Sequence, residues 1–327
     1  MKQKGFYSSF NFQLVFHLLG VIIFIVGLFM ILPYFYSLYY NESIKNSLLI
    51  SCLITISAGL IIYFITNSNL SRNFTKRESL LLVSVAWIII PFFGVLPYVL
   101  SKSLSFTNAF FETVSGFTTA GASILTEIES LPKGILFWRS LTHWIGGMGI
   151  IVLFLALFPF IQTSRIQMFN AESSVVVESK VFPRLLNISR SLWFVYLGLT
   201  FLQTIFLLFG GMDLFESLCH SFGTIATGGF STRNESIFVF SAYIQYVIIF
   251  FMILAGVNFS LYVYLFRKDF SKFFSNEELK YYILITLVVS VIIFVTLFFA
   301  GNNINVESTF REALFQTVSI ITTTGYS

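Results

Sequence analysis

The sequence predicts an all-α membrane protein that crosses the bilayer several times and carries repeated pore-loop units. Two observations predict this class. The 327 residues are 56% hydrophobic and only 10% charged, whereas soluble globular proteins carry roughly 25% charged residues. In addition, three segments of 19 residues align with one another without a gap, and internal repeats of this kind indicate a repeated architecture.

The three repeated segments are SFTNAFFETVSGFTTAGAS, DLFESLCHSFGTIATGGFS and TFREALFQTVSIITTTGYS. Each begins with a residue that caps helix N-termini, namely Ser105, Asp213 or Thr309. Apolar residues then recur at a helical spacing, which places one apolar stripe on each helix. In the first copy, a helix from the residue after the cap to Gly116 is about 16 Å long, whereas the hydrocarbon core of a bilayer is about 30 Å thick. We therefore predict three helices that enter the membrane without crossing it.

A run rich in threonine and glycine follows each half-length helix. Glycine occupies its fourth position in all three copies, as Gly121, Gly229 and Gly325. Extended backbone survives at membrane depth only where protein buries it or where it lines a watery cavity. There, carbonyl oxygens can replace the water shell of a cation, and the negative end of the half-length helix also favours a cation. The alternative is three external loops that are merely rich in glycine and threonine.

We interpret these runs as filter segments whose backbone carbonyls bind an ion. The predicted ion-binding residues are Thr118, Thr119, Ala120, Gly121, Ala226, Thr227, Gly228, Gly229, Thr322, Thr323, Thr324 and Gly325. Glu112, His220 and Gln316 share one polar position of the half-length helices. We expect these three side chains to support the filters from behind through hydrogen bonds. The alternative is a water-exposed position at the outer rim.

Seven stretches are long and apolar enough to span a bilayer. They are residues 14–40, 47–66, 79–100, 134–161, 191–211, 237–266 and 279–300. Most of the 19 Lys and Arg residues fall on the side of the N-terminus, so the positive-inside rule predicts a cytoplasmic N-terminus and filters in the outer half of the membrane. The net charge of +4 follows from this topology and does not indicate binding to nucleic acid.

The order of parts predicts four regions along the chain. We expect an N-terminal transmembrane hairpin at 1–66, a first pore repeat at 67–161, a second at 162–270, and the first half of a third at 271–327. His17, His143 and His220 lack the spacing of metal ligands. Because the sequence also has no nucleophile motif and no phosphate-binding glycine loop, we do not expect an enzyme.

These motifs give the chain a resemblance to the TrkH/KtrB family of bacterial potassium-uptake proteins, which is related to the plant HKT transporters. The resemblance covers essentially the whole chain and is most specific at FFETVSGFTTAGAS, WIGGMGIIVL and HSFGTIATGGFST. It implies span, pore helix and span units, as in potassium channels, repeated around a pseudo-fourfold pore. The extra N-terminal hairpin looks more like the TrkH branch. In the plant relatives, glycine rather than serine in the first filter goes with potassium preference, so Gly121 favours potassium.

The resemblance also implies a cellular role. It implies potassium uptake across the plasma membrane, which is the inner membrane of a bacterium, by a homodimer under the control of a cytosolic nucleotide-binding subunit similar to TrkA or KtrA. Potassium is the only ion or cofactor implied. The sequence departs from the family pattern after the third filter, since the second span of repeat three and all of repeat four are missing. We therefore expect this chain alone not to conduct. The alternatives are a truncated, non-conducting or modulatory subunit and a sodium-coupled or sodium-permeable transporter.

Overall fold

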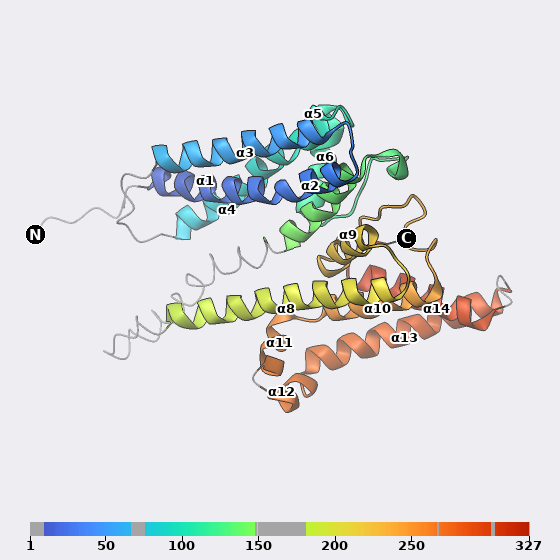
Figure 1. Ribbon diagram of the computed structural model, residues 1–327. Helices are drawn as coiled ribbons and strands as arrows, with labels where there is room; N and C mark the ends of the chain where they lie inside the picture. The colour runs from blue at the N-terminus through green and yellow to red at the C-terminus, as the bar shows by residue number, and fades with distance from the viewer. Residues whose placement is uncertain are drawn as a thin grey trace, which may run out of the picture. The chain divides into compact units, whose positions relative to one another are not determined.

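The computed structural model describes residues 10–66, 76–147, 149, 181–266, 268–301 and 305–326 (Figure 1). These residues form helices and turns, with no strand among them, which confirms the predicted all-α class. They divide into two compact units, one that holds the described residues up to Phe110 and one that holds those from Phe111 onward.

The first unit is a bundle of apolar helices. Its helices are α1 (Phe12–Phe29), α2 (Ile31–Tyr39), α3 (Lys45–Ile65), α4 (Lys76–Gly94) and α5 (Leu96–Leu100). Helices α1 and α3 run side by side, in blue in Figure 1. A Cβ atom at Gly59 of α3 would lie 2.8 Å from the Cα atom of Phe24 of α1, so glycine lets the two backbones approach closely, as is common between membrane helices.

The second unit contains most of the repeated segments. Helix α6 (Phe106–Phe117) leads into it from the first unit, and residues 133–147 are also helical. The other helices are η1 (Ile128–Ser130), α8 (Val181–Phe209), α9 (Leu214–Ile225), α10 (Ala242–Gly256), α11 (Phe259–Phe266), α12 (Phe270–Phe274), α13 (Glu277–Phe299) and α14 (Val306–Ile321). The three half-length helices predicted from the repeats are α6, α9 and α14, and we call them the pore helices.

Two of the three pore helices begin where the sequence predicts. The side chain of Asp213 accepts a hydrogen bond from the amide of Glu216 (2.7 Å), and Ser105 caps α6 in the same way. The predicted start of the third helix at Thr309 is wrong. Helix α14 begins four residues earlier because Asn305 caps it, and the Thr309 hydroxyl instead donates to the Asn305 carbonyl one turn into the helix.

Several described helices are long and apolar enough to cross a membrane. Five qualify, or six if the bent pair of α10 and α11 counts as one span. This pair departs from the continuous span predicted at 237–266, because α10 begins only at Ala242 and the two helices meet at a bend of 94°. The chain turns at Val257, whose backbone is extended. The span predicted at 134–161 lies partly outside the described residues.

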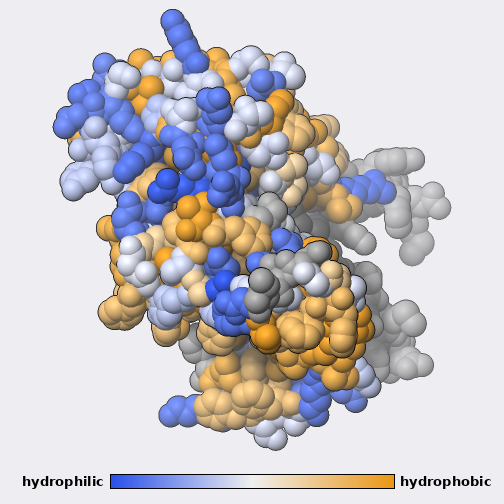
Figure 2. Space-filling view, turned by 90° about the vertical axis from the view of Figure 1, so that its right-hand side faces the viewer, coloured by the Kyte–Doolittle hydropathy of each residue, from blue (hydrophilic) through white to orange (hydrophobic). Residues whose placement is uncertain are grey.

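The surface agrees with a bilayer environment. Figure 2 shows hydrophobic side chains exposed over wide areas of the face in view, and many large apolar residues on α1, α3, α8 and α13 are exposed. Helix α13 is the least buried of the candidate spans. Apolar exposure on this scale marks contact with lipid or with another protein rather than with water.

Candidate functional site

The pore helices end in one common arrangement. In α9 the amide of Thr227 donates to the carbonyl of Thr224 (3.0 Å), and the amide of Gly228 donates to the carbonyl of Gly223 (2.8 Å). These two bonds form a Schellman motif, which ends a helix with one residue in the left-handed conformation. Helix α6 ends with the same two bonds, and α14 has the first of them. The three filter segments, residues 118–121, 226–229 and 322–325, therefore leave their helices in the same direction.

The backbone angles of the filter segments repeat as well. The second residue of each has a positive φ, 54° at Thr119, 52° at Thr227 and 58° at Thr323. The fourth residue is the glycine, with φ between 72° and 77° in all three copies. The third residue is not among those with positive φ. This alternation of sign turns successive carbonyls toward one side, as a carbonyl-lined filter requires.

Threonine in the left-handed region is unusual because its branched Cβ crowds the backbone. Such a residue costs about 1 to 3 kcal/mol and persists only where the surroundings impose it. The same angle recurs at Thr119, Thr227 and Thr323, so it belongs to the repeat rather than to one loop. The sequence did not predict this angle for the threonines.

Neighbouring filter segments are in contact. A Cβ atom at Gly121 would overlap the carbonyl oxygen of Gly228, and one at Gly229 would overlap the carbonyl oxygen of Thr324. The glycines of the first and second segments thus face the third residue of the next segment. The three segments therefore lie in chain order around one shared space, and only glycine allows this approach.

Two polar residues of the pore helices hold the chain just after a filter. Glu112 accepts hydrogen bonds from the Ser123 hydroxyl (2.9 Å) and from the amide of Ile124 (3.1 Å). In the next copy, Nε2 of His220 lies 3.1 Å from the hydroxyl of Ser231, the residue equivalent to Ser123. Both side chains are fully buried, which is not the exposure of an outer rim. Their role in ion binding stays a prediction.

The imidazole of His220 has a defined tautomer. Its Nδ1 atom lies 2.8 Å from the carbonyl oxygen of Glu216, which can only accept, so Nδ1 carries the proton and the unprotonated Nε2 shares the Ser231 hydroxyl proton with the Ser236 carbonyl. Gln316 occupies the same position in the third copy and is half-buried. The serine equivalent to Ser231 in that copy, at position 327, lies outside the described residues.

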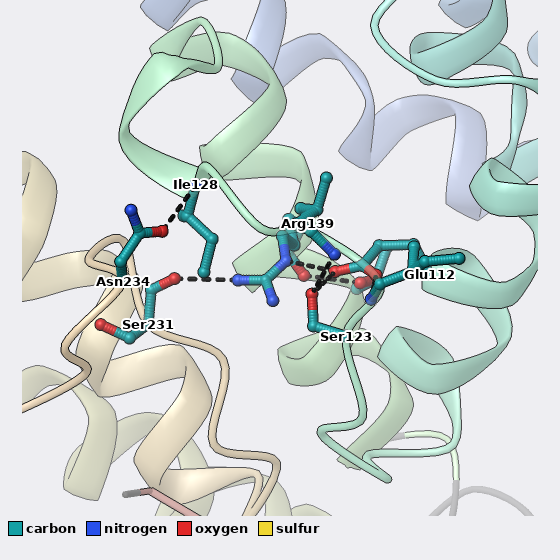
Figure 3. A network of polar contacts seen from close by, with 9 residues as sticks. Glu112, Ser123, Ile128, Arg139, Ser231 and Asn234 are labelled. Carbon is teal, nitrogen blue, oxygen red and sulfur yellow. Dashed lines mark hydrogen bonds and ion pairs between the residues drawn. The ribbon is translucent and has the colours of Figure 1, made fainter.

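Arg139 links the first filter to the second (Figure 3). Its Nε atom donates to Glu112 at 2.6 Å, and its Nη1 atom donates to the carbonyl oxygen of Ser231 at 2.8 Å. The guanidinium carbon also lies 3.6 Å from the centroid of the Phe230 ring, a cation–π geometry. Arg139 and Glu112 are both buried. Two segments that follow different filters are therefore held by one buried ion pair.

Sequence reasoning counted Arg139 only as one of the basic residues on the outer side. A signal was present, because an ionisable residue within an apolar span marks a functional position by default. Figure 3 also shows a second link, in which the amide of Ile128 donates to the side chain of Asn234 at 2.8 Å. Both links join the first repeat to the loop after the second filter.

The residues after the second and third filter glycines contact the preceding repeat. Phe230 stacks on the ring of His143 at 3.9 Å between centroids, and the hydroxyl of Tyr326 donates to the carbonyl of His220 at 3.2 Å. His143 also lies against the second filter itself. A Cβ atom at Gly228 would be 2.6 Å from the Cε1 atom of His143, so the imidazole fills the space that a larger residue would need.

Metal-ligand clusters are not part of this picture. In the part of the chain that the structure describes, no three His, Cys, Asp or Glu residues lie close enough together to hold a metal ion. The polar groups that converge on the filters are instead backbone carbonyls and amides, with side chains behind them. Such a set of oxygens suits a weakly held monovalent cation in transit.

Comparisons with known proteins agree with this arrangement. Residues 44–327 match the sequence profile of the TrkH family, described as a cation transport protein. The Trk system potassium uptake protein TrkH of Salmonella typhimurium is 33% identical over 322 residues, which cover 97% of this chain and 66% of that protein. The Trk system potassium uptake protein TrkG of Escherichia coli K12 is 29% identical over 323 residues, with the same coverage.

A solved structure is similar as well. The crystal structure of the potassium transporter TrkH from Vibrio parahaemolyticus matches with a TM-score of 0.85 and 29% identity, over 97% of this chain and 66% of that one. The chain thus spans just under two thirds of the length of these proteins.

Proposed function

The chain belongs to the TrkH family, and on this premise we propose that it forms part of a potassium-uptake system as its membrane subunit. One observation carries the proposal. All three pore helices end in a similar way, and the filter segment that follows each has a positive φ at its second and fourth residues, such as Thr119 and Gly121. The names of the relatives, which are potassium uptake proteins, support potassium as the ion. The function is passage of an ion rather than an enzymatic reaction.

In this proposal, potassium sheds water at the filter and is coordinated by the carbonyl oxygens of residues 118–121, 226–229 and 322–325. Selectivity then depends on the number and spacing of these oxygens. Glu112, His220 and Gln316 support the filters from behind. The contacts of Glu112 and His220 with the residues after their filters are consistent with this role. A glycine at Gly121 favours potassium over sodium by resemblance to the plant transporters.

We place the chain in the plasma membrane, the inner membrane of a bacterium, with a cytoplasmic N-terminus. We keep as a proposal the boundaries expected from the sequence, a hairpin at 1–66 and pore repeats at 67–161, 162–270 and 271–327. A homodimer and a cytosolic nucleotide-binding subunit complete the system. The cytoplasmic face would then include α12 and the turn before it, where Lys272 and Lys268, respectively, are exposed. A hydrogen bond from Lys272 lowers the pKa of Asp269, so this carboxylate stays charged and offsets part of the basic surface.

The orientation can be tested by labelling in intact cells. Single cysteines beside Glu127 and Arg233 should react with a membrane-impermeant thiol reagent, whereas a cysteine beside Lys272 should react only after the membrane is opened. Cys52 and Cys219 are buried, so the native thiols should add little background. Labelling beside Lys272 in closed cells, without labelling beside Glu127, would reverse the proposed topology.

Potassium uptake itself is the direct test of the function. We expect a bacterial strain that lacks its own uptake systems to grow at low potassium when it expresses this chain joined after Ser327 to the last third of the Salmonella typhimurium relative. Uptake of rubidium, a potassium analogue, should rise with growth. A chimera that inserts into the membrane and takes up neither ion would contradict the proposal.

A further inference from the structure

Two tyrosines make matching contacts on successive repeats. Tyr196 of α8 donates its hydroxyl hydrogen bond to the carbonyl of Trp144 at 3.0 Å, and Tyr282 of α13 donates to the carbonyl of Ile253 at 3.1 Å. Each acceptor lies in the helix that follows a filter. Each donor lies on the first span of the next repeat. One bond therefore ties the first repeat to the second, and the other ties the second to the third.

A glycine lies three residues after each acceptor, beside the start of the next filter. A Cβ atom at Gly147 would be 2.7 Å from the Tyr196 hydroxyl and 3.1 Å from the Cβ atom of Ala226. A Cβ atom at Gly256 would be 2.6 Å from the Tyr282 hydroxyl and 2.8 Å from Cγ2 of Thr322. Ala226 and Thr322 are the first residues of the second and third filters. The tyrosine hydroxyl, the glycine and the filter start therefore form one packed unit in both places.

The two spans that carry the tyrosines share a sequence pattern. Hydroxyl residues follow at intervals of four, at Thr200 and Thr204 after Tyr196 and at Thr286 and Ser290 after Tyr282. All four are buried and bond back to the carbonyl four residues earlier. In α8 this face is bonded to its neighbours, since the Trp144 indole donates to Thr200 and the Thr204 hydroxyl donates to Ser221 of the pore helix. The matching register shows that these contacts belong to the repeat.

The bond at Ile253 lies where α10 breaks. The amide of Val257 donates to Leu254 rather than to Ile253, so the Ile253 carbonyl has lost its helical partner and Tyr282 supplies another. A buried carbonyl without a partner is costly. Tyr282 therefore holds the end of α10 just before the 94° bend. Its hydroxyl and the Thr322 side chain both lie beside Gly256.

We propose that Tyr196 and Tyr282 are positioning residues that hold the second and third filters, respectively, by clamping the helix that follows the preceding filter against the first residue of the next filter. The inference rests on the proposed function only where it concerns ion selectivity. The clamps act through Gly147 and Gly256 and do not touch the ion. Loss of one hydroxyl should loosen the filter next to it and leave the other unchanged.

Hydrogen–deuterium exchange of the full chain in lipid nanodiscs tests this placement. The amides of Thr227, Gly228, Thr323 and Gly325 are hydrogen-bonded, so their exchange reports local opening. In Tyr196→Phe we expect exchange at residues 226–229 to be roughly tenfold faster, the effect of losing one buried hydrogen bond. In Tyr282→Phe the same change should appear at 322–325. Each variant is the control for the other.

A third variant separates positioning from general stability. The hydroxyl of Tyr262 donates to the carbonyl of Leu254 at 2.7 Å, beside the same bend, but it comes from α11 of the same repeat. Tyr262→Phe should leave exchange at both filters unchanged. Unchanged exchange in Tyr196→Phe and Tyr282→Phe, or an equal effect of Tyr262→Phe, would overturn the proposal.

Transport adds the functional readout. With uptake established for the unaltered protein, Tyr196→Phe and Tyr282→Phe should lower the ratio of potassium to sodium uptake, while Tyr262→Phe should keep it. Faster exchange with an unchanged ratio would reduce the tyrosines to structural residues, and this would overturn the proposal as well. If the unaltered protein takes up no potassium, the proposed function fails, and the exchange measurement alone decides the role of the tyrosines.

Discussion

Replacing Arg139 with methionine should lower the free energy of unfolding by about 3 to 5 kcal/mol, because it leaves the Glu112 carboxylate buried without its partner. The variant also loses the bond from Arg139 to the Ser231 carbonyl, so the chain after the second filter should loosen. We expect potassium uptake to be lost. Denaturation of the protein in detergent, followed by tryptophan fluorescence, measures the stability change.

Two further variants show whether the buried charge is the cause. Glu112→Gln combined with Arg139→Met removes both charges and keeps an oxygen that accepts from Ser123 and Ile124, so a large part of the stability should return. Arg233→Met breaks the ion pair with Glu216, in which the Arg233 side chain is 39% exposed, and should cost about 1 kcal/mol or less. Equal losses of unfolding free energy for Arg139→Met and Arg233→Met would show that burial of the Arg139–Glu112 pair does not add to its contribution.

Replacing Gly229 with alanine should abolish potassium uptake. Its φ of 76° is left-handed, which costs a residue with a Cβ atom about 1 to 2 kcal/mol. The new Cβ atom would also overlap the carbonyl oxygen of Thr324, so the second and third filters must move apart. A shift of that kind changes the spacing of the coordinating oxygens, and we expect the rate of rubidium uptake to fall at least about tenfold, the equivalent of 1.4 kcal/mol.

Gly211 provides the matched control for this substitution. It has a similar φ of 85°, but no atom lies within 4 Å of the position its Cβ would take. Gly211→Ala therefore introduces the backbone strain without the overlap. It should reduce stability and leave uptake near that of the unaltered protein. If Gly211→Ala abolished uptake to the same degree, strain rather than filter spacing would explain the loss at Gly229.

The sequence was informative wherever a structure is set by neighbours in the chain. The caps at Ser105 and Asp213 act on amides three residues away, so the alignment alone located the starts of α6 and α9. The start of α14 was missed because Asn305 lies outside the repeated segment. The bend after Gly256 was missed because the stretch is uniformly apolar, and hydropathy does not distinguish a straight span from a broken one.

The contacts behind the filters could not be predicted in this way. Glu112 and Arg139 are 27 residues apart, and Arg139 and Ser231 are 92 apart, so only the packing of two repeats brings them together. The repeats did predict that Glu112 and His220 take equivalent positions. They could not show that Arg139 bridges the chain after two filters, because α10, the equivalent helix of the second repeat, has no arginine to align with it.

The contact between His143 and Gly228 has a consequence for how such a protein diverges after its repeats have duplicated. The third filter position is alanine in the first copy, glycine in the second and threonine in the third, and the glycine occurs where an imidazole of the preceding repeat occupies the space. A larger side chain at Gly228 would meet the ring, so this position can change only if His143 moves or is replaced by a smaller residue. A difference between copies at the third filter position is therefore linked to a side chain on the other side of the boundary between two repeats.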